Sequence, residues 1–257
     1  MDLKLKAKRA LVTGASKGIG KSCAMVLAQE GCEVLLVSRD GAALKELAAE
    51  IKATTGAKVD YLSADLSAKG SAKTVSDWAG DIDILVNNAG AIPGGDLLTV
   101  DEDTWRSAWD LKVFGYINLC REVYRKMKAR HEGVIVNVLG AAGERLTSSY
   151  IAGSTGNAGL MAFTRALGGS SHKDGIRVVG VSPGPVATDR LTKVYKQRAL
   201  AMYGDENRWT DLVAGMAFGR PATPEEISYT VAFVASERSS YTTGIYITID
   251  GGLAAAN

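Results

Sequence analysis

Short apolar runs alternate with longer amphipathic segments along almost the whole chain. Runs rich in β-branched residues or leucine predict strands at 9–13, 33–38, 58–63, 82–87, 133–138, 176–181 and 245–249. Segments with helical periodicity separate them, at 18–30, 41–55, 68–80, 101–129, 151–171 and 224–236. This alternation predicts an α/β fold with one domain over 1–257, a doubly wound parallel sheet of about seven strands with helices on both faces. The strand runs are almost continuously apolar, which is typical of strands covered on both sides.

Composition narrows the class of protein further. The chain has 257 residues, 46% of them hydrophobic, so it is long enough to bury a core without a metal or disulfide. A net charge of +2 gives no reason to expect a nucleic-acid or membrane partner. Cys23, Cys32 and Cys120 lack metal-ligand spacing and predict buried free thiols, with no metal site. Neither a signal peptide nor a membrane span is indicated, so we expect a cytoplasmic protein.

One stretch departs from the regular alternation. Residues 189–222 carry many basic and aromatic side chains after a late strand, and we expect them to form a substrate lid. The alternative is an ordinary solvated pair of helices. The basic residues within 189–208 hint at an acidic group on the substrate.

The first predicted strand leads directly into a glycine-rich loop and then a helix. Glycines permit a tight turn and a close approach of the backbone to a pyrophosphate, and the helix N-terminus offers free N–H groups. The residues expected to line this phosphate site are Gly14, Ser16, Lys17, Gly18, Ile19 and Gly20. Because the strand before it and the helix after it are both predicted, the motif carries more weight than glycines alone.

The Gly-x-x-x-Gly-x-Gly spacing of this loop resembles that of the short-chain dehydrogenase/reductase family. Four more segments resemble the family in the same order, at 65, 87–90, 183–188 and 248–252. The resemblance implies a Rossmann-type NAD(P)-binding domain that acts on a small molecule, and a homotetramer or homodimer. It also implies cofactor contacts from Asp65, Leu66, Asn88, Ala89, Gly90, Pro183, Gly184, Val186 and Thr188.

The end of the second strand bears on the choice of cofactor. An NAD site usually places a carboxylate there to bind the ribose 2′-hydroxyl. This chain has Ser38 followed by Arg39, and Lys17 adds a second cation from the glycine-rich loop. A guanidinium and an ammonium suit a 2′-phosphate, so we expect NADP rather than NAD. The alternative is that Arg39 pairs with Asp40 or faces solvent.

The resemblance fails at the catalytic positions. The family uses a serine, a tyrosine, a lysine and an asparagine, and the aligned positions here hold Gly140, Gly153, Asn157 and Lys112. Lys112 is one candidate for a relocated proton-transfer group, and its alternative is a lysine that snorkels to solvent. Tyr150 is the other candidate, and its alternative is packing at a helix start or a subunit contact.

Three functions remain open from the sequence. The favoured one is an NADP(H)-dependent oxidoreductase with relocated proton transfer, acting on a carbonyl, enone or imine. The others are a non-redox enzyme that uses Lys112, and a catalytically silent NADP-binding sensor or scaffold. Glycines at 153, 156 and 159 predict close approach of a ligand or helix. His131 and His172 are interpreted as surface residues.

Overall fold

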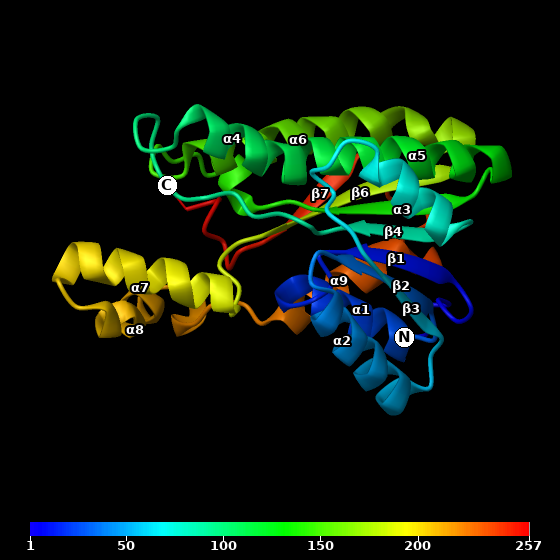
Figure 1. Cartoon of the computed structure of the whole chain (residues 1–257), viewed down its shortest axis with the longest axis horizontal. Coiled ribbons are helices and arrows are strands. Elements are labelled where there is room, and N and C mark those ends of the chain that lie inside the picture. Colours follow the sequence, from blue (N-terminus) through cyan, green and yellow to red (C-terminus); the bar gives the residue numbers. More distant parts are fainter. Residues whose placement is uncertain (257) are drawn as a thin grey trace.

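The computed structural model describes residues 1–256 and has a single seven-stranded sheet at its centre (Figure 1). The strand order is β3-β2-β1-β4-β5-β6-β7, and every neighbouring pair is parallel. The strands are β1 (Arg9–Thr13), β2 (Glu33–Ser38), β3 (Val59–Ser63), β4 (Ile84–Asn87), β5 (Gly133–Val138), β6 (Ile176–Pro183) and β7 (Ile245–Ile249). The predicted doubly wound α/β fold is therefore confirmed.

Helices cover both faces of the sheet, as Figure 1 shows. One layer consists of α1 (Gly18–Gln29), α2 (Gly41–Thr55) and α9 (Pro224–Ala235). The other consists of α3 (Ser71–Ala79), α4 (Glu102–Trp109), α5 (Gly115–Arg130) and α6 (Ile151–Ser171). Two large hydrophobic clusters fill the spaces between the sheet and these layers. This arrangement follows from apolar strands whose side chains point alternately to the two faces.

The expected helix over 101–129 proves to be three pieces. The helix α4 ends at Trp109, a π-helical turn covers Asp110–Phe114, and α5 begins at Gly115. A π-helical turn widens the backbone spiral and is often found at functional sites. It holds Lys112 at its centre. Smaller corrections are that β3 and β4 begin at Val59 and Ile84, and that β6 continues to Pro183.

The strand order places the turning point of the chain at the centre of the sheet. From β1 the chain moves outward to β2 and β3, and then returns to β4 on the other side of β1. In open parallel sheets, ligands bind beyond the carboxyl ends of the strands at such a point. The loops after β1, β4, β5 and β6 therefore define the candidate site.

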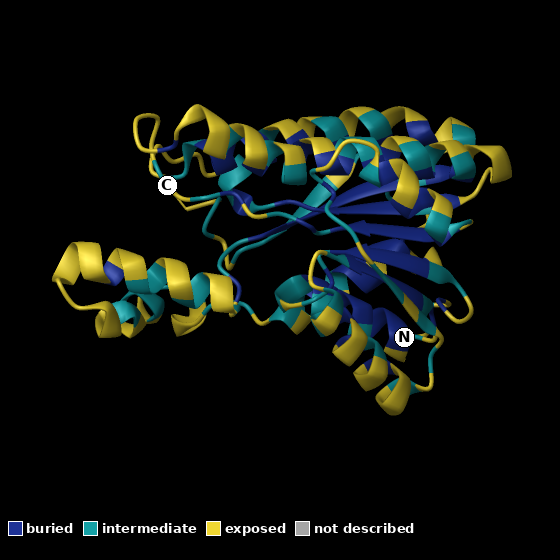
Figure 2. Cartoon of the chain, in the orientation of Figure 1, coloured by how far each residue is buried: buried dark blue, intermediate teal, exposed yellow. Residues whose placement is uncertain are grey.

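Residues 189–222 form mostly helices that stand to one side of the sheet layers (Figure 1). They comprise α7 (Asp189–Tyr203), α8 (Trp209–Ala214) and short 3₁₀ turns at Glu206–Arg208 and Ala217–Gly219. Figure 2 shows that these helices are largely exposed. The pair of helices that the alternative interpretation expects is therefore present. Contacts of Arg190, in the first turn of α7, connect it to the candidate site.

Several smaller expectations are also met. The three cysteines are free and buried, and burial raises the pKa of each thiol to about 12. His131 and His172 are exposed. Among residues 1–256, no helix combines the length and apolar character that crossing a bilayer requires.

Candidate active site

The glycine-rich loop has the shape that a phosphate cradle requires. Gly14 and Gly18 adopt positive φ angles of 63° and 57°, which residues with a Cβ rarely adopt. A Cβ on Gly20 would collide with the carbonyl oxygen of Gly14 and with the side chain of Asn88. Lys17 lies at the N-cap of α1 with its side chain exposed. The loop therefore presents backbone N–H groups at a helix N-terminus to an incoming phosphate.

Thr13 holds this loop against the loop after β4. Its Oγ1 accepts hydrogen bonds from the backbone N–H groups of Asn88 (2.9 Å) and Ala89 (3.1 Å). In return, the Asn88 side chain donates to the carbonyl oxygens of Thr13 (3.1 Å) and Gly14 (3.2 Å). Thr13 is fully buried, and the sequence analysis did not assign it a role. The signal in the sequence is a threonine that ends the apolar run of β1.

The loops after β2 and β3 bring Arg39 close to Asp65. Asp65 lies two residues beyond the end of β3, and its carboxylate accepts bonds from the backbone (3.0 Å) and hydroxyl (2.7 Å) of Ser67. Those bonds, and to a smaller extent the charge of Arg39, lower the pKa of Asp65. Asp40 caps α2 by accepting from the N–H of Ala43 at 3.0 Å. Within residues 1–256 Arg39 forms no ion pair, so the expected alternative of pairing with Asp40 is not found.

The other residues expected at the cofactor site line the same edge of the sheet. Ser38 Oγ accepts from the N–H of Asp40 at 3.2 Å, and Leu66 is buried beneath the Asp65 loop. Ser16 and Ile19 are half-buried in the glycine-rich loop. Their contact with a cofactor stays a prediction.

The loop after β6 reaches across to the glycine-rich loop. Pro183 pairs with Ile249 of β7, and Gly184 packs closely on Asp250. Val186 forms a bridge with residue 222, and Thr188 caps α7. A Cβ on Gly18 would lie 3.2 Å from Thr188 Cγ2. Loops from distant parts of the chain therefore meet at the edge of the sheet where doubly wound folds bind dinucleotides.

Lys112 points into this edge of the sheet. Its Nζ donates to the carbonyl oxygens of Val138 (3.2 Å) and Leu139 (3.3 Å) at the end of β5. The same nitrogen lies 5.3 Å from the ring centroid of Tyr116. Tyr116 is buried and donates its hydroxyl to Val138 O at 2.8 Å. The alternative in which Lys112 extends into solvent is not the conformation found.

The surroundings of Lys112 alter its acidity. Burial and, to a smaller extent, the nearby charge of Arg190 lower the pKa of Lys112 from 10.5 to about 7. The aliphatic part of the side chain packs on Gly90, where a Cβ would lie 2.6 Å from Lys112 Cδ. The ammonium is therefore held in a confined place where losing its proton near neutral pH is favourable.

Tyr150 fills the space beside Gly153. A Cβ on Gly153 would coincide with the Tyr150 phenol ring. The Tyr150 hydroxyl oxygen accepts a hydrogen bond from the Arg190 guanidinium at 3.1 Å. Tyr150 also packs on a small apolar cluster that contains Ile92 and Ala152. The ring packs at the start of α6, as the alternative for Tyr150 expected, and the hydroxyl reaches toward α7. Its role in proton transfer stays a prediction.

Asn157 fills the space beside Gly140 in a similar way. A Cβ on Gly140 would lie 3.2 Å from both the Nδ2 and the Oδ1 of Asn157. The Asn157 Nδ2 donates to the carbonyl oxygen of Gly153 at 2.8 Å, one turn earlier in α6. Asn157 Oδ1 is buried and has no hydrogen-bond partner within residues 1–256. A buried amide oxygen without a donor is costly unless a ligand or water supplies one.

Arg190 connects the residues around the candidate site through three hydrogen bonds. From α7 it donates to Ile92 O at 2.7 Å, to Gly90 O at 3.4 Å and to the Tyr150 hydroxyl. Contacts connect Lys112 with Gly90, Gly90 with Arg190, and Arg190 with Tyr150. They continue through Gly153, Asn157, Gly140 and Leu139 back to Lys112. The sequence marked Arg190 only as one of several basic residues. The four residues predicted to stand at the family's catalytic positions therefore lie in one connected set of contacts.

The glycines of α6 have different surroundings. A Cβ on Gly156 would lie 3.2 Å from Trp109 Nε1 and from Val113, so the expected close approach of a neighbouring helix is present there. At Gly153 the close neighbour is Tyr150. Gly159 has open space beside it among the residues described, so the expectation was wrong at that position for the single chain.

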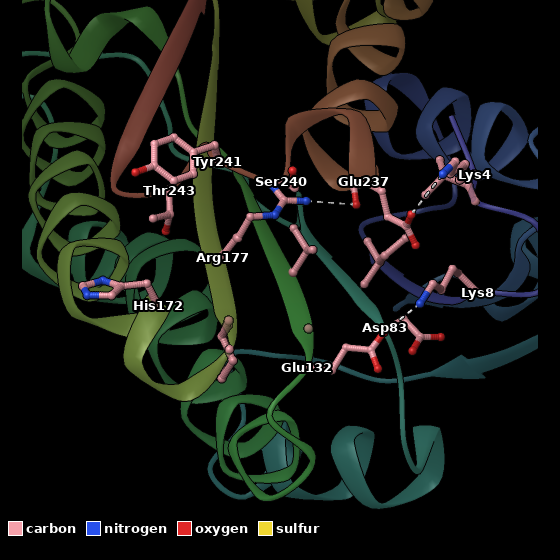
Figure 3. A pocket seen from close by; sticks show the side chains of 17 residues that line it. Lys4, Lys8, Asp83, Glu132, His172, Arg177, Glu237, Ser240, Tyr241 and Thr243 are labelled. Atoms are coloured by element: carbon pink, nitrogen blue, oxygen red, sulfur yellow. Dashed lines mark hydrogen bonds and ion pairs between the residues drawn. The ribbon is translucent and has the colours of Figure 1, made fainter. Parts of the chain in front are cut away.

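A cavity of about 610 Å³ opens at the opposite, amino-terminal edge of the sheet (Figure 3). Most of its charged side chains are already bonded within the protein. Lys8 bonds Glu132 at 2.7 Å, and the Arg177 guanidinium donates to carbonyl oxygens at the end of α9, including Val234 O at 2.7 Å. With its charges satisfied internally and the glycine-rich loop at the far edge, this cavity is not the candidate active site.

Comparison with known proteins agrees with the geometry. The family model described as short chain dehydrogenase matches residues 8–199. The chain therefore belongs to the short-chain dehydrogenase/reductase family, whose members among its relatives are oxidoreductases. One relative is the 3-oxoacyl-[acyl-carrier-protein] reductase FabG of Chlamydia muridarum. It is 33% identical over 259 residues, which cover 99% of this chain and 100% of that protein.

Solved structures of the family superpose over nearly the whole chain. The L-sorbose reductase of Gluconobacter frateurii, complexed with NADPH and L-sorbose, has a TM-score of 0.91 at 30% identity and full coverage of both chains. An NAD⁺-bound xylitol dehydrogenase has a TM-score of 0.89 at 25% identity, covering 97% of this chain and 100% of that one. Both nicotinamide dinucleotides therefore occur among the structural relatives, and the choice between them rests on local residues.

Proposed function

We propose that this protein is an NADP(H)-dependent oxidoreductase whose proton transfer is relocated to Lys112 and Tyr150, and that it acts on a carbonyl, enone or imine small molecule. The observation that carries this proposal is the inward position of Lys112, bonded to Val138 O and Leu139 O. A site that had merely lost its function would not need a lysine held inside it.

The cofactor residues support NADP over NAD. Arg39 is exposed at the end of β2, without an ion-pair partner among the residues described, and Lys17 is exposed in the glycine-rich loop. Both cations suit a 2′-phosphate, which a carboxylate at this position would repel. When bound, this cofactor supplies hydride chemistry. The protein contributes position, charge and a proton.

The two proposed groups have complementary roles. Lys112, with a pKa of about 7, changes protonation readily at neutral pH, as a proton-transfer group should. Tyr150 accepts its hydrogen bond from Arg190, so its own hydroxyl proton remains free to be donated to a substrate oxygen or nitrogen. The Glu144 carboxylate accepts a hydrogen bond from Thr248 Oγ1 at 2.7 Å, so we assign it no part in the proton transfer.

The segment 189–222 acts as a lid in this proposal. Arg190, in the first turn of α7, is its contact with the loop after β4 and with Tyr150. We propose that the protein is a cytoplasmic homotetramer or homodimer, as the family resemblance implies.

The test is NADPH oxidation followed at 340 nm with a broad panel of ketones, enones and imines. Wild type is compared with Lys112→Met, with Tyr150→Phe and with Lys193→Met, an exposed α7 residue that serves as the control. We expect turnover in wild type and control, and a loss of about 10²–10⁴-fold in the Lys112 variant, with a smaller loss for Tyr150→Phe. Unchanged turnover in both site variants overturns the relocated site.

Two other outcomes identify the alternative functions. Tight NADPH binding without turnover on the whole panel would support a catalytically silent sensor or scaffold. Turnover of a substrate without NADP(H), lost in Lys112→Met, would support a non-redox enzyme on the same scaffold.

A further inference from the structure

Lys112 and Arg190 both lie beside Gly90 in the candidate site, and neither has a counter-charge among residues 1–256. The Lys112 ammonium contacts two backbone carbonyls and the face of Tyr116. The Arg190 guanidinium contacts two backbone carbonyls and a phenol oxygen. Within residues 1–256, no carboxylate lies at ion-pair distance from either cation.

Several other basic residues of the chain do have a carboxylate partner. Lys8, Lys21 and Arg220 all pair with glutamates at 2.7–2.8 Å. Lys112 loses hydration in its confined place, and no anion replaces it, whereas Arg190 is exposed and adds a like charge nearby. Burial is the main cause of the lowered pKa of Lys112, and the like charge of Arg190 adds to it.

The acidic groups nearest the site are held elsewhere. Glu144 accepts from Thr248, and Asp250 accepts from the N–H groups of Gly252 (2.8 Å) and of residue 254 (2.6 Å). The cofactor's phosphate groups belong, in the proposed function, to the glycine-rich loop and Arg39. The Lys112–Arg190 pair is therefore left for a different anion.

We propose that the substrate carries a carboxylate close to its reacting carbon, and that Lys112 and Arg190 bind this carboxylate between them and so determine specificity. This inference rests on the proposed function for the reaction but concerns binding alone. A guanidinium offers a planar fork to a carboxylate, and an ammonium adds a point charge. In the absence of substrate, backbone carbonyls and the Tyr150 oxygen satisfy the same donors.

The test compares an anion with its neutral isostere and requires no turnover. Oxamate and oxamide are titrated by calorimetry into NADPH-saturated protein at pH 6.5, below the Lys112 pKa of about 7. We expect oxamate to bind at least tenfold more tightly than oxamide. Lys112→Met and Arg190→Gln should each remove most of that preference, while oxamide binding stays the same.

The matched control is Lys193→Met, which removes a charge from the exposed face of the same helix. It should keep the preference for oxamate, because a general attraction to the basic helix is not what we propose. NADPH affinity and thermal unfolding of each variant verify that the cofactor site and the fold are retained.

The proposal is overturned if oxamate and oxamide bind equally, if neither binds, or if the preference survives in both site variants. A preference that depends on Lys112 and Arg190, in a protein that oxidises no NADPH with any oxo acid, leaves the anion site standing and removes the redox function. NADPH oxidation with neutral ketones, without a preference for oxamate, removes the anion site and leaves the redox function standing.

Discussion

The phenol ring of Tyr150 lies on the backbone of Gly153, in the space that any side chain at position 153 would need. Tyr150 is the N-cap residue of α6, and its ring turns back onto the first turn of the helix, where Gly153 lies. The absence of a side chain at 153 and the inward turn of the tyrosine at 150 are therefore one structural feature. It leaves the Tyr150 hydroxyl on the Arg190 guanidinium.

Gly153→Ala should therefore destabilise the protein although alanine is the better helix former. The new Cβ displaces the Tyr150 ring, at a cost of about 1–3 kcal/mol for overpacking. Gly159→Ala in the same helix is the control, since its Cβ would meet open space, and it should stabilise by up to about 1 kcal/mol. Urea unfolding of both variants measures the difference, and equal effects would contradict the contact. Tyr150→Ala should make Gly153→Ala tolerable.

A second prediction concerns Gly140 and Asn157. A methyl group at 140 meets the Asn157 carboxamide at 3.2 Å and supplies no hydrogen bond. A serine hydroxyl has the same contact but can donate to the unpartnered Asn157 Oδ1. We expect Gly140→Ser to be more stable than Gly140→Ala by about 1 kcal/mol in thermal or urea unfolding. With Asn157→Ala in the background, that advantage should vanish; its persistence would show that the amide is not involved.

The pH dependence of stability should report the lowered pKa of Lys112. Its folded-state pKa of about 7 lies below the unfolded value of 10.5. Below pH 7 both states hold the proton, and the folded state carries the full cost of a buried charge. Between about pH 7 and 10.5 only the unfolded state holds it, so the free energy of unfolding rises with pH by at most about 1.4 kcal/mol per unit.

The measurement is urea unfolding of wild type and Lys112→Met between pH 6 and 9. Wild type should gain about 1–3 kcal/mol relative to the variant between pH 7 and 9, and nothing below pH 6.5. If the difference in unfolding free energy stays constant over the whole pH range, it contradicts an inward lysine that loses its proton there. Lys193→Met is the control for the loss of an exposed charge and should run parallel to wild type.

Arg39 should separate the two cofactors. Arg39→Ala removes the guanidinium proposed for the 2′-phosphate, so NADPH affinity should fall about tenfold or more, while NADH affinity changes little. Fluorescence titration with each cofactor measures this. Lys45→Ala, an exposed lysine of the neighbouring helix α2, is the control and should affect neither. Equal losses for both cofactors in Arg39→Ala would remove the assignment to NADP.

Much of the fold was readable because it is encoded locally. The alternation of apolar runs and amphipathic segments predicted all seven strands, and the glycine-rich loop between β1 and α1 was predicted together with its phosphate role. The boundary errors fall where tertiary packing overrides the pattern. The π-helical turn at Asp110–Phe114 has no signature in the hydrophobic period, because it depends on how α4 and α5 pack against the rest.

The sequence by itself determined the order of strands, helices and family-like motifs, and from those motifs it predicted that the family's four catalytic positions hold Gly140, Gly153, Asn157 and Lys112. Only the tertiary structure decided what those changes amount to. Tyr150 covers Gly153, Asn157 covers Gly140, and Lys112 turns inward to the end of β5. Except for Tyr150 on Gly153, these contacts join different elements, and whether a side chain points inward depends on the packing of its neighbours. That is why snorkelling and inward positions of Lys112 were indistinguishable in the sequence but distinct in the fold.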